Sequence, residues 1–205
     1  MIRLIKWIHS PVYRMRIKGM HDQILPWLNS GDRILDVGCG YGALGKMIME
    51  SPWCPADVKV MGLEKTSRDH IQIPIEYYSG NQIPYSNNSF DIIILADVLH
   101  HEIDQHKLID ECARISKRYI IIKDHKLDGA WAQYRISLMD WFSNIPYDIP
   151  CLYHYNRLLD WHRLYQQHRL HLIFEAHTVK LYPSILNFIL GGRIQYFAVL
   201  QPDGR

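Results

Sequence analysis

The most constraining feature of this sequence is an apolar run near its middle, Ile92 to Leu95, in which no polar residue alternates with the apolar ones. A strand with one face in water alternates, so this run is typical of a strand buried on both faces of a sheet. Similar short runs recur around it, separated by segments with helical spacing, as parallel strands with crossover helices require. The runs that predict strands are Arg33 to Val37, Val58 to Leu63, Ile73 to Tyr78, Asp91 to Leu95 and Tyr119 to Lys123.

The segments between and after these runs predict helices and a final strand pair. Apolar residues at helical spacing predict one helix over Ala43 to Ile48 and another that follows Asp104. Asn156 is expected to cap a later helix. The last extended runs are His171 to Leu181 and Gly192 to Leu200, and about ten residues are too few for a helical crossover between them. These two strands should therefore be antiparallel, and the fold class is α/β.

The composition is that of a globular chain: 205 residues, of which 48% are hydrophobic and 21% charged. A formal charge of +2 is too small to predict a polyanionic partner, and no apolar run approaches the roughly 18 to 20 residues that span a bilayer. The four cysteines form no CxxC pair, which favours reduced thiols in a cytosolic protein. We expect one domain over 1–205, with an N-terminal helical segment (1–30), a ligand-binding core (31–125), an insertion (126–155) and a C-terminal helix and strand pair (156–205).

The sharpest motif is Asp36-Val37-Gly38-Cys39-Gly40-Tyr41-Gly42, between the first strand and the first helix. Glycines there allow a ligand to lie against the backbone. The spacing also satisfies a dinucleotide-binding fingerprint, but Glu64 comes later than the ribose-binding acid of that fingerprint. Asp36 would moreover repel a pyrophosphate and attract a cationic ligand. A cationic ligand is therefore favoured over a dinucleotide.

Four ordered segments resemble the class I S-adenosylmethionine-dependent methyltransferases, in particular the small-molecule group that includes ubiquinone and menaquinone biosynthesis enzymes. The segments are Ile34 to Gly42, Gly62-Leu63-Glu64, Ile83-Pro84-Tyr85 through Ser89-Phe90-Asp91, and Asp97-Val98-Leu99-His100-His101. The resemblance implies a Rossmann-like, mostly parallel seven-stranded sheet of order 3-2-1-4-5-7-6, with an antiparallel last strand and helices on both faces. It also implies S-adenosylmethionine as the cofactor.

The resemblance further implies which residues hold the cofactor. In this family the glycine loop packs against the adenosyl and methionine parts, and the acid after the second strand binds the ribose hydroxyls. Ser79 stands where many relatives carry an adenine-binding acid, so a neutral acceptor, shared with its neighbours, would replace a charged one. The implied binding residues are Asp36, Gly38, Cys39, Gly40, Glu64, Lys65, Ser79, Gly80, Asn81, Ala96 and Asp97. The small volume of Cys39 explains its place in the loop, and no nucleophilic role is expected.

Candidate catalytic residues follow the fourth and fifth strands. Methyl transfer requires two aligned reactants and, for many acceptors, removal of a proton. His100 and His101, and Asp124 with His125, lie where strand ends would face the ligand, and imidazole titrates near neutral pH. Each histidine could also serve structure alone, for example as a cap. The other histidines are scattered and no paired carboxylates have ligand spacing, so no metal site is expected.

The insertion is expected to cover the acceptor. Its aromatic residues suit a hydrophobic or aromatic small molecule, with Asn144 as a polar contact, although core packing would explain such residues equally well. These aromatic residues are Trp131, Tyr134, Trp141, Phe142 and Tyr147. The alternatives are an RNA or protein methyltransferase and a non-catalytic cofactor-binding or assembly subunit. Balanced charge and the absence of an Asn-Pro-Pro-Tyr-like tetrad disfavour the first, and no nucleic-acid partner is expected.

The N-terminal segment combines apolar residues and Trp7 with five basic residues and no acid in its first 20 positions. Such a segment can make peripheral contact with an anionic membrane surface, or it can pack over the ligand pocket. Pro11 is expected to divide it into two short pieces.

Overall fold

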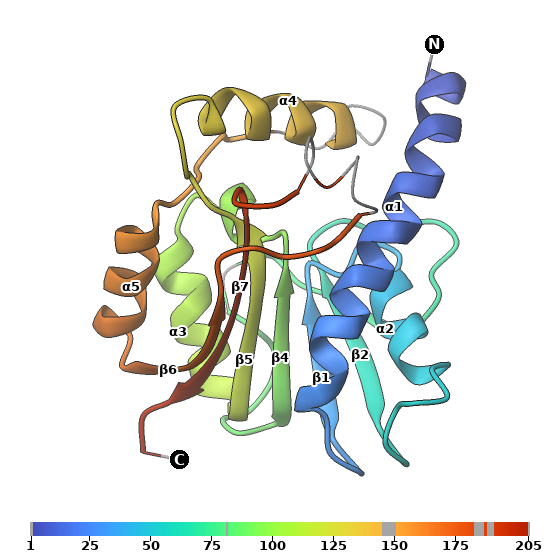
Figure 1. The fold of residues 1–205 in the computed structure, drawn as a ribbon. Coiled ribbons are helices and arrows are strands. Elements are labelled where there is room, and N and C mark those ends of the chain that lie inside the picture. The colour runs from blue at the N-terminus through green and yellow to red at the C-terminus, as the bar shows by residue number, and fades with distance from the viewer. Residues whose placement is uncertain (1, 81, 145–150, 183–186, 188–190, 205) are drawn as a thin grey trace.

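The computed structural model describes residues 2–80, 82–144, 151–182, 187 and 191–204, with side chains from Pro11 onward. Its core is a seven-stranded sheet with helices on both faces (Figure 1). The strands are β1 (Arg33–Val37), β2 (Lys59–Glu64), β3 (Ile75–Tyr77), β4 (Phe90–Ala96), β5 (Ser116–His125), β6 (Leu170–Ala176) and β7 (Gln195–Pro202). The helices are α1 (Ile2–Ile24), η1 (Leu25–Trp27), α2 (Ala43–Met49), η2 (Leu99–His101), α3 (Gln105–Ile115), α4 (Ala132–Asn144) and α5 (Leu158–Gln167).

The strand order is β3-β2-β1-β4-β5-β7-β6, which confirms the predicted sheet. β1 to β5 pair in parallel, and β7 pairs antiparallel with both β5 and β6. The strand order reverses between β1 and β4: from β1 the chain continues to β2 on one side, and from β4 it continues to β5 on the other. In open α/β sheets, ligands bind outside the carboxyl ends of the strands at such a point. The topology therefore places the binding site beside Asp36 and Asp97.

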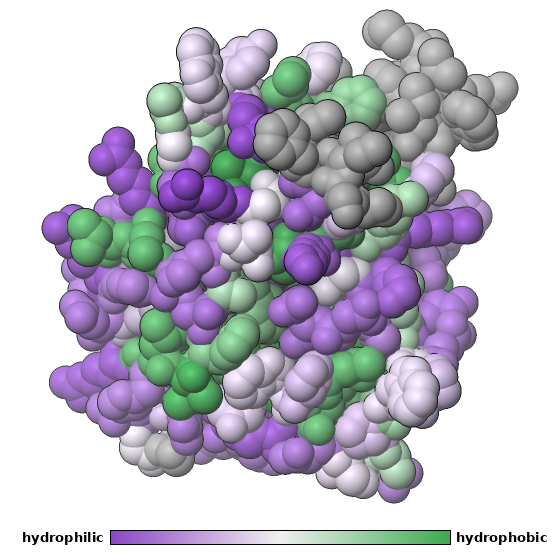
Figure 2. Space-filling model, viewed as in Figure 1, coloured by the Kyte–Doolittle hydropathy of each residue, from purple (hydrophilic) through white to green (hydrophobic). Residues whose placement is uncertain are grey.

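Both faces of the sheet are covered by apolar helix faces. α3 and α5 cover one face, with Leu108, Ile109 and Trp161 in the core. α1 and α2 cover the other, where Ile17 and Ile48 pack against β1 and β4. The predicted helices after β1 and after Asp104 are confirmed, and the Asp104 carboxylate caps α3 by accepting from the Lys107 N–H. On the face drawn in Figure 2, hydrophilic side chains predominate, with apolar groups over α5 and the edge strand β6.

Some predicted boundaries are wrong. β3 begins at Ile75, because Pro74 has no N–H to give to a neighbouring strand. β6 ends at Ala176 instead of Leu181, and beyond it Val179 forms only an isolated bridge with Gly192.

Two predicted local features are also corrected. α1 continues through Pro11 as one helix. Proline removes one helical hydrogen bond, but burial of Ile17 and Met20 in the core stabilises the second half of the helix and compensates for that loss. Asn156 does not cap α5: its side chain donates to Gln105 Oε1, and Arg157 is the cap residue.

The insertion is partly helical, as expected. α4 lies across the carboxyl end of the sheet (Figure 1). Its buried face carries Ala132, Ile136 and Asp140. Among the described residues, no helix has the length and apolar character needed to cross a membrane.

Candidate functional site

A cavity of about 470 Å³, the main cavity, opens where β1, β2 and β4 end. It brings together most of the residues that the sequence predicted for cofactor binding. These are Asp36, Gly38, Cys39, Gly40, Glu64, Lys65, Ala96 and Asp97. α1 contributes Arg16, Ile17 and Met20 to the same cavity, so the second half of this helix covers the site.

The glycine loop and the acid after β2 are joined by hydrogen bonds. The Gly40 N–H donates to Glu64 Oε2 at 2.9 Å, and the Lys65 N–H donates to Oε1 at 2.8 Å. A side chain built at Gly40 would meet no atom within 4 Å, whereas one at Gly38 would lie 2.6 Å from Val98. Gly40 therefore leaves room for a ligand, and Gly38 leaves room for the protein's own packing.

Two ionisable side chains at the end of β1 and in the glycine loop, Asp36 and Cys39, line this cavity. Asp36 is 2% exposed, and burial, followed by the neighbouring Glu64 carboxylate, raises the pKa of Asp36 to about 7. A cationic ligand beside Asp36 would favour the ionised carboxylate. Burial also raises the pKa of the Cys39 thiol far above its ordinary value, so this thiol stays protonated and is not a nucleophile.

The residues predicted beside the adenine line a neighbouring cavity of about 330 Å³. Ser79 and Gly80 lie there, and Asn81 falls outside the described residues. Lys65 and Glu102 line both cavities and form an ion pair with an N–O distance of 2.6 Å. This pair stands between the predicted ribose and adenine positions.

The predicted histidines meet at a third, smaller cavity of about 80 Å³. His100, His101 and His125 all line it, together with Asp97, and His101 also lines the main cavity. Asp124 lines none of these three cavities: it is 1% exposed and its Oδ1 lies 2.5 Å from His100 Nδ1. Asp124 also accepts from the backbone N–H of His125 and of Leu99. Its place is therefore behind His100, and it touches only the backbone of His125.

The three imidazoles differ in charge. Burial opposes protonation of His100, but the carboxylates of Asp124 and Asp140 outweigh it and raise the pKa of His100 to about 10. Burial, assisted by Lys123, lowers the pKa of His125 to about 3. At neutral pH His100 is therefore charged and His125 is neutral.

Asp97 connects the two cavities. Its φ is +58°, and its Oδ1 accepts from Lys123 Nζ at 2.5 Å. Its Oδ2 lies 2.7 Å from Arg16 Nη2, an ion pair without hydrogen-bond geometry at that oxygen. Although burial opposes ionisation, Arg16 and Lys123 lower the pKa of Asp97. Two cations are thus held by one carboxylate at the centre of the site.

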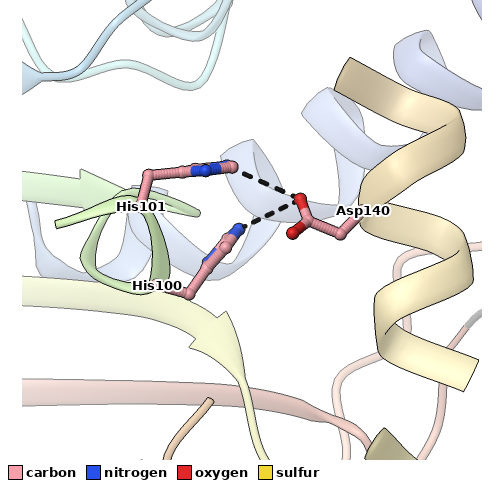
Figure 3. Close-up of side chains that lie close together, drawn as sticks. All are labelled: His100, His101 and Asp140. Atoms are coloured by element: carbon pink, nitrogen blue, oxygen red, sulfur yellow. Dashed lines mark ion pairs between the residues drawn. The ribbon is translucent and has the colours of Figure 1, made fainter. Parts of the chain in front are cut away.

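Sequence reasoning missed Asp140. It is an acid on the buried face of α4, and its Oδ1 lies 3.5 Å from His100 Nε2 and 3.6 Å from His101 Nε2 (Figure 3). The Tyr155 hydroxyl donates to Asp140 Oδ2, and the Asn144 side-chain amide donates to Asp140 Oδ1. A lone acid four residues after the buried Ile136 was the available signal. The expectation of no metal site rested on the scattered histidines and on the absence of paired carboxylates at ligand spacing, and it did not consider Asp140.

The expected aromatic pocket in the insertion is not observed among the described residues. Trp131, Tyr134 and Trp141 are exposed, by 74%, 67% and 46%. Trp131 immediately precedes α4, whereas Tyr134 and Trp141 lie on this helix, about 120° and 100° around it from Asp140. Asn144 does line both the main and the small cavity, as expected, and Tyr147 falls outside the described residues.

Comparison with known proteins identifies the family to which this chain belongs. Residues 13–180 match a family model described as a methyltransferase domain, and the chain belongs to this family. The class I S-adenosylmethionine-dependent methyltransferase resemblance is thereby confirmed, and S-adenosylmethionine is the cofactor that the family implies.

Two curated relatives and one solved structure illustrate the similarity. 27-O-demethylrifamycin SV methyltransferase of Amycolatopsis mediterranei (strain S699) is 29% identical over 113 residues, 49% of this chain and 38% of the relative. Demethylmenaquinone methyltransferase of Corynebacterium urealyticum (strain ATCC 43042 / DSM 7109) is 28% identical over 91 residues, 44% of this chain and 39% of the relative. The chain therefore spans about two fifths of the length of these relatives. A SAM dependent methyltransferase from Aquifex aeolicus shares the fold, with a TM-score of 0.62, 17% identity and 98% of each chain covered.

The residues of the main cavity fit this cofactor. Gly40 leaves open space at the loop, the Glu64 carboxylate is already oriented by two backbone N–H groups, and Asp36 is a buried acid suited to a positive charge. They would offer the cofactor a surface for its nucleoside, an acceptor for its ribose hydroxyls and a counterion for its sulfonium or ammonium group.

Proposed function

We propose that this protein transfers the methyl group of S-adenosylmethionine to oxygen, nitrogen or carbon of a small apolar or aromatic acceptor. The observation that carries the proposal is the junction of two cavities. The main cavity holds Asp36 and Glu64, and it shares Asp97, His101 and Asn144 with the small polar cavity. An acceptor at this junction would lie between the cofactor residues and the histidines.

The lining of the main cavity supports an apolar acceptor. Ile17 and Met20 come from α1, Val98 follows β4, and Ile103 and Leu152 are further apolar residues of the wall. Apolar walls with a few directed polar groups are typical of small-molecule sites. Besides the polar residues assigned to the cofactor, His101 and Asn144 offer polar contacts to an acceptor where this cavity meets the small one.

Among the three histidines, we assign contact with the acceptor's reacting atom to His101. Its side chain is 21% exposed and it lines both cavities. His100 has carboxylates beside both ring nitrogens, and His125 does not line the main cavity. We place His100, Asp124 and His125 around His101 as positioning residues.

When bound, the cofactor supplies an electrophilic methyl group on a sulfonium. The residues of this chain would hold and orient the reactants: Glu64 the ribose, Asp36 the positive charge, and His101 with Asp140 the reacting end of the acceptor. Any proton that the acceptor loses on methylation would leave its reacting atom beside His101 and Asp140. Alignment and proton removal are the two contributions that methyl transfer needs from the protein.

The test is transfer of a labelled methyl group from S-adenosylmethionine across phenols, quinols, lipids, amines and RNA. The proposal expects label in a small apolar acceptor and none in RNA. Label confined to RNA or protein would support the alternative substrate class instead. Cofactor binding without transfer to any acceptor would indicate a non-catalytic cofactor-binding subunit.

A further inference from the structure

Three side chains converge at the small cavity with donor atoms facing one another. His100 and His101 lie on η2, directly after β4, and Asp140 approaches from α4 (Figure 3). One ligand atom from each lies within 4.8 Å of the others. Asp140 Oδ1 is 3.5 Å from His100 Nε2 and 3.6 Å from His101 Nε2. Two imidazoles and one carboxylate are thus directed at a common point.

The spacing of these atoms fits an ion better than direct hydrogen bonds. N–H···O hydrogen bonds are about 2.7 to 3.2 Å long, which is shorter than both nitrogen–oxygen distances to Asp140. Zinc binds histidine and carboxylate ligands at about 2.0 to 2.2 Å, which puts neighbouring ligands of a tetrahedral ion about 3.4 Å apart. The observed 3.5 and 3.6 Å lie close to that value.

Partners behind the ligands would hold them in place. Asp124 Oδ1 contacts His100 Nδ1 at 2.5 Å and leaves Nε2 directed at Asp140. The Tyr155 hydroxyl donates to Asp140 Oδ2 at 2.8 Å, and the Asn144 amide donates to Oδ1 at 2.5 Å. Carboxylates that orient histidine ligands, and hydrogen bonds to ligating carboxylates, are typical of metal sites.

The site has space and an open side. The cavity of about 80 Å³ that all three residues line exceeds the volume of a water molecule. His101 and Asn144 also line the main cavity, so a fourth ligand could come from there. Arg16 and Lys123 lie nearby and would repel a cation, but both are paired with Asp97.

We propose that His100, His101 and Asp140 bind one divalent transition-metal ion of the zinc type. A ligating imidazole must be neutral, so binding releases to solvent the proton that His100 Nε2 carries in the metal-free protein. Two imidazoles and one carboxylate suit zinc, iron or cobalt better than magnesium or calcium, which prefer oxygen ligands. The role of the ion, though not its binding, rests on the proposed function: it would bind the acceptor's oxygen in the open position, and the acceptor would lose its proton more readily. His101 would then contact the acceptor through the ion.

The test uses the full chain, freed of metal with a chelator, and titrates Zn²⁺ by calorimetry and Co²⁺ by visible absorption. We expect one equivalent of each ion to bind, with Co²⁺ giving the absorption of a four-coordinate site. Asp140→Asn and His101→Ala should each weaken binding by about 100-fold or more, because removing a hydrogen-bond partner of a metal ligand alone costs about 10- to 100-fold. The matched control is His171→Gln, which alters a surface histidine paired with Asp203 and should bind as the unmodified chain does.

The outcomes separate this inference from the proposed function. Absence of stoichiometric binding, or equal binding by Asp140→Asn and His171→Gln, overturns the inference. If His101→Ala remains folded, as shown by unchanged S-adenosylhomocysteine affinity, its loss of metal is assigned to the ligand and not to unfolding. Methyl transfer by the chelated protein would leave the proposed function intact and refute the role of the ion, whereas metal binding without any transfer would refute the proposed function alone.

Discussion

His100 Nδ1 lies 2.5 Å from Asp124 Oδ1, and only 3% and 1% of these two residues are exposed. The pair links the end of β5 to the turn that follows β4. Asp124 also accepts from the Leu99 N–H at 3.1 Å and the His125 N–H at 2.6 Å. One buried carboxylate thus fixes the two segments that carry the predicted catalytic histidines.

Replacing this carboxylate should destabilise the protein. Asp124→Ala leaves His100 and two backbone N–H groups without their buried partner, and breaking a buried ion pair from one side costs about 3 to 5 kcal/mol. Urea unfolding measures the change in the free energy of unfolding. Glu50→Ala is the control, since the Lys46 and Glu50 side chains of its ion pair are 43% and 67% exposed and such a pair contributes at most about 1 kcal/mol. Equal losses in the two variants would contradict the assigned role of Asp124.

Cofactor affinity should depend on pH through Asp36. Its pKa in the folded protein, about 7, is above the ordinary value, so this group contributes stability at low pH that is lost as pH rises toward 7. A cationic ligand favours the ionised form, so binding must displace the proton below pH 7. We expect S-adenosylmethionine affinity to rise about five- to tenfold between pH 6 and 7.5. Calorimetry on Asp36→Asn should show a flat profile, and the same slope in that variant would assign the dependence to another group.

Turnover should depend on His101 more than on His125. Once an acceptor is known, His101→Ala should lower the single-turnover rate by about 100-fold or more while cofactor affinity stays nearly unchanged. His125→Ala should have a smaller effect, because burial and Lys123 keep the pKa of His125 low and the ring uncharged. His106→Ala is the control, as that ring pairs with His168 on the surface. A full rate in His101→Ala across pH 6 to 9 would exclude this histidine from proton removal.

Membrane contact by the N-terminal segment remains a prediction. The side chains of residues 1–10 lie outside those described, and the part of α1 that is described covers the main cavity through Arg16, Ile17 and Met20. Sedimentation with anionic and neutral vesicles at low and high salt tests the contact, which should appear only with anionic lipid at low salt. Loss of cofactor affinity on deleting residues 1–10, without lipid binding at low salt, would leave only the covering role.

The sheet and cofactor loop could be predicted because their signals are local. Ile92 to Leu95 is apolar throughout because helices cover both faces of the sheet. Glu64 ends β2 and Gly40 lies in the loop after β1, and the parallel pairing of these two strands brings the two residues together. Asp140 could not be predicted in the same way. α4 carries apolar residues on its buried and exposed faces alike, so its sequence does not reveal which face carries the site. The meeting of Asp140 with His100 depends on packing between segments about 40 residues apart.

The central claim is that the cavity at the ends of β1, β2 and β4 binds S-adenosylmethionine, and a pair of glycine variants tests it most directly. Gly40 and Gly31 both have positive φ, +60° and +78°, and a side chain at either would meet no atom within 4 Å. Valine therefore strains the backbone similarly at both positions, but only at Gly40 does it occupy the cavity. Calorimetry should show that Gly31→Val binds S-adenosylmethionine and that folded Gly40→Val does not. Unchanged affinity in a folded Gly40→Val protein would contradict the account.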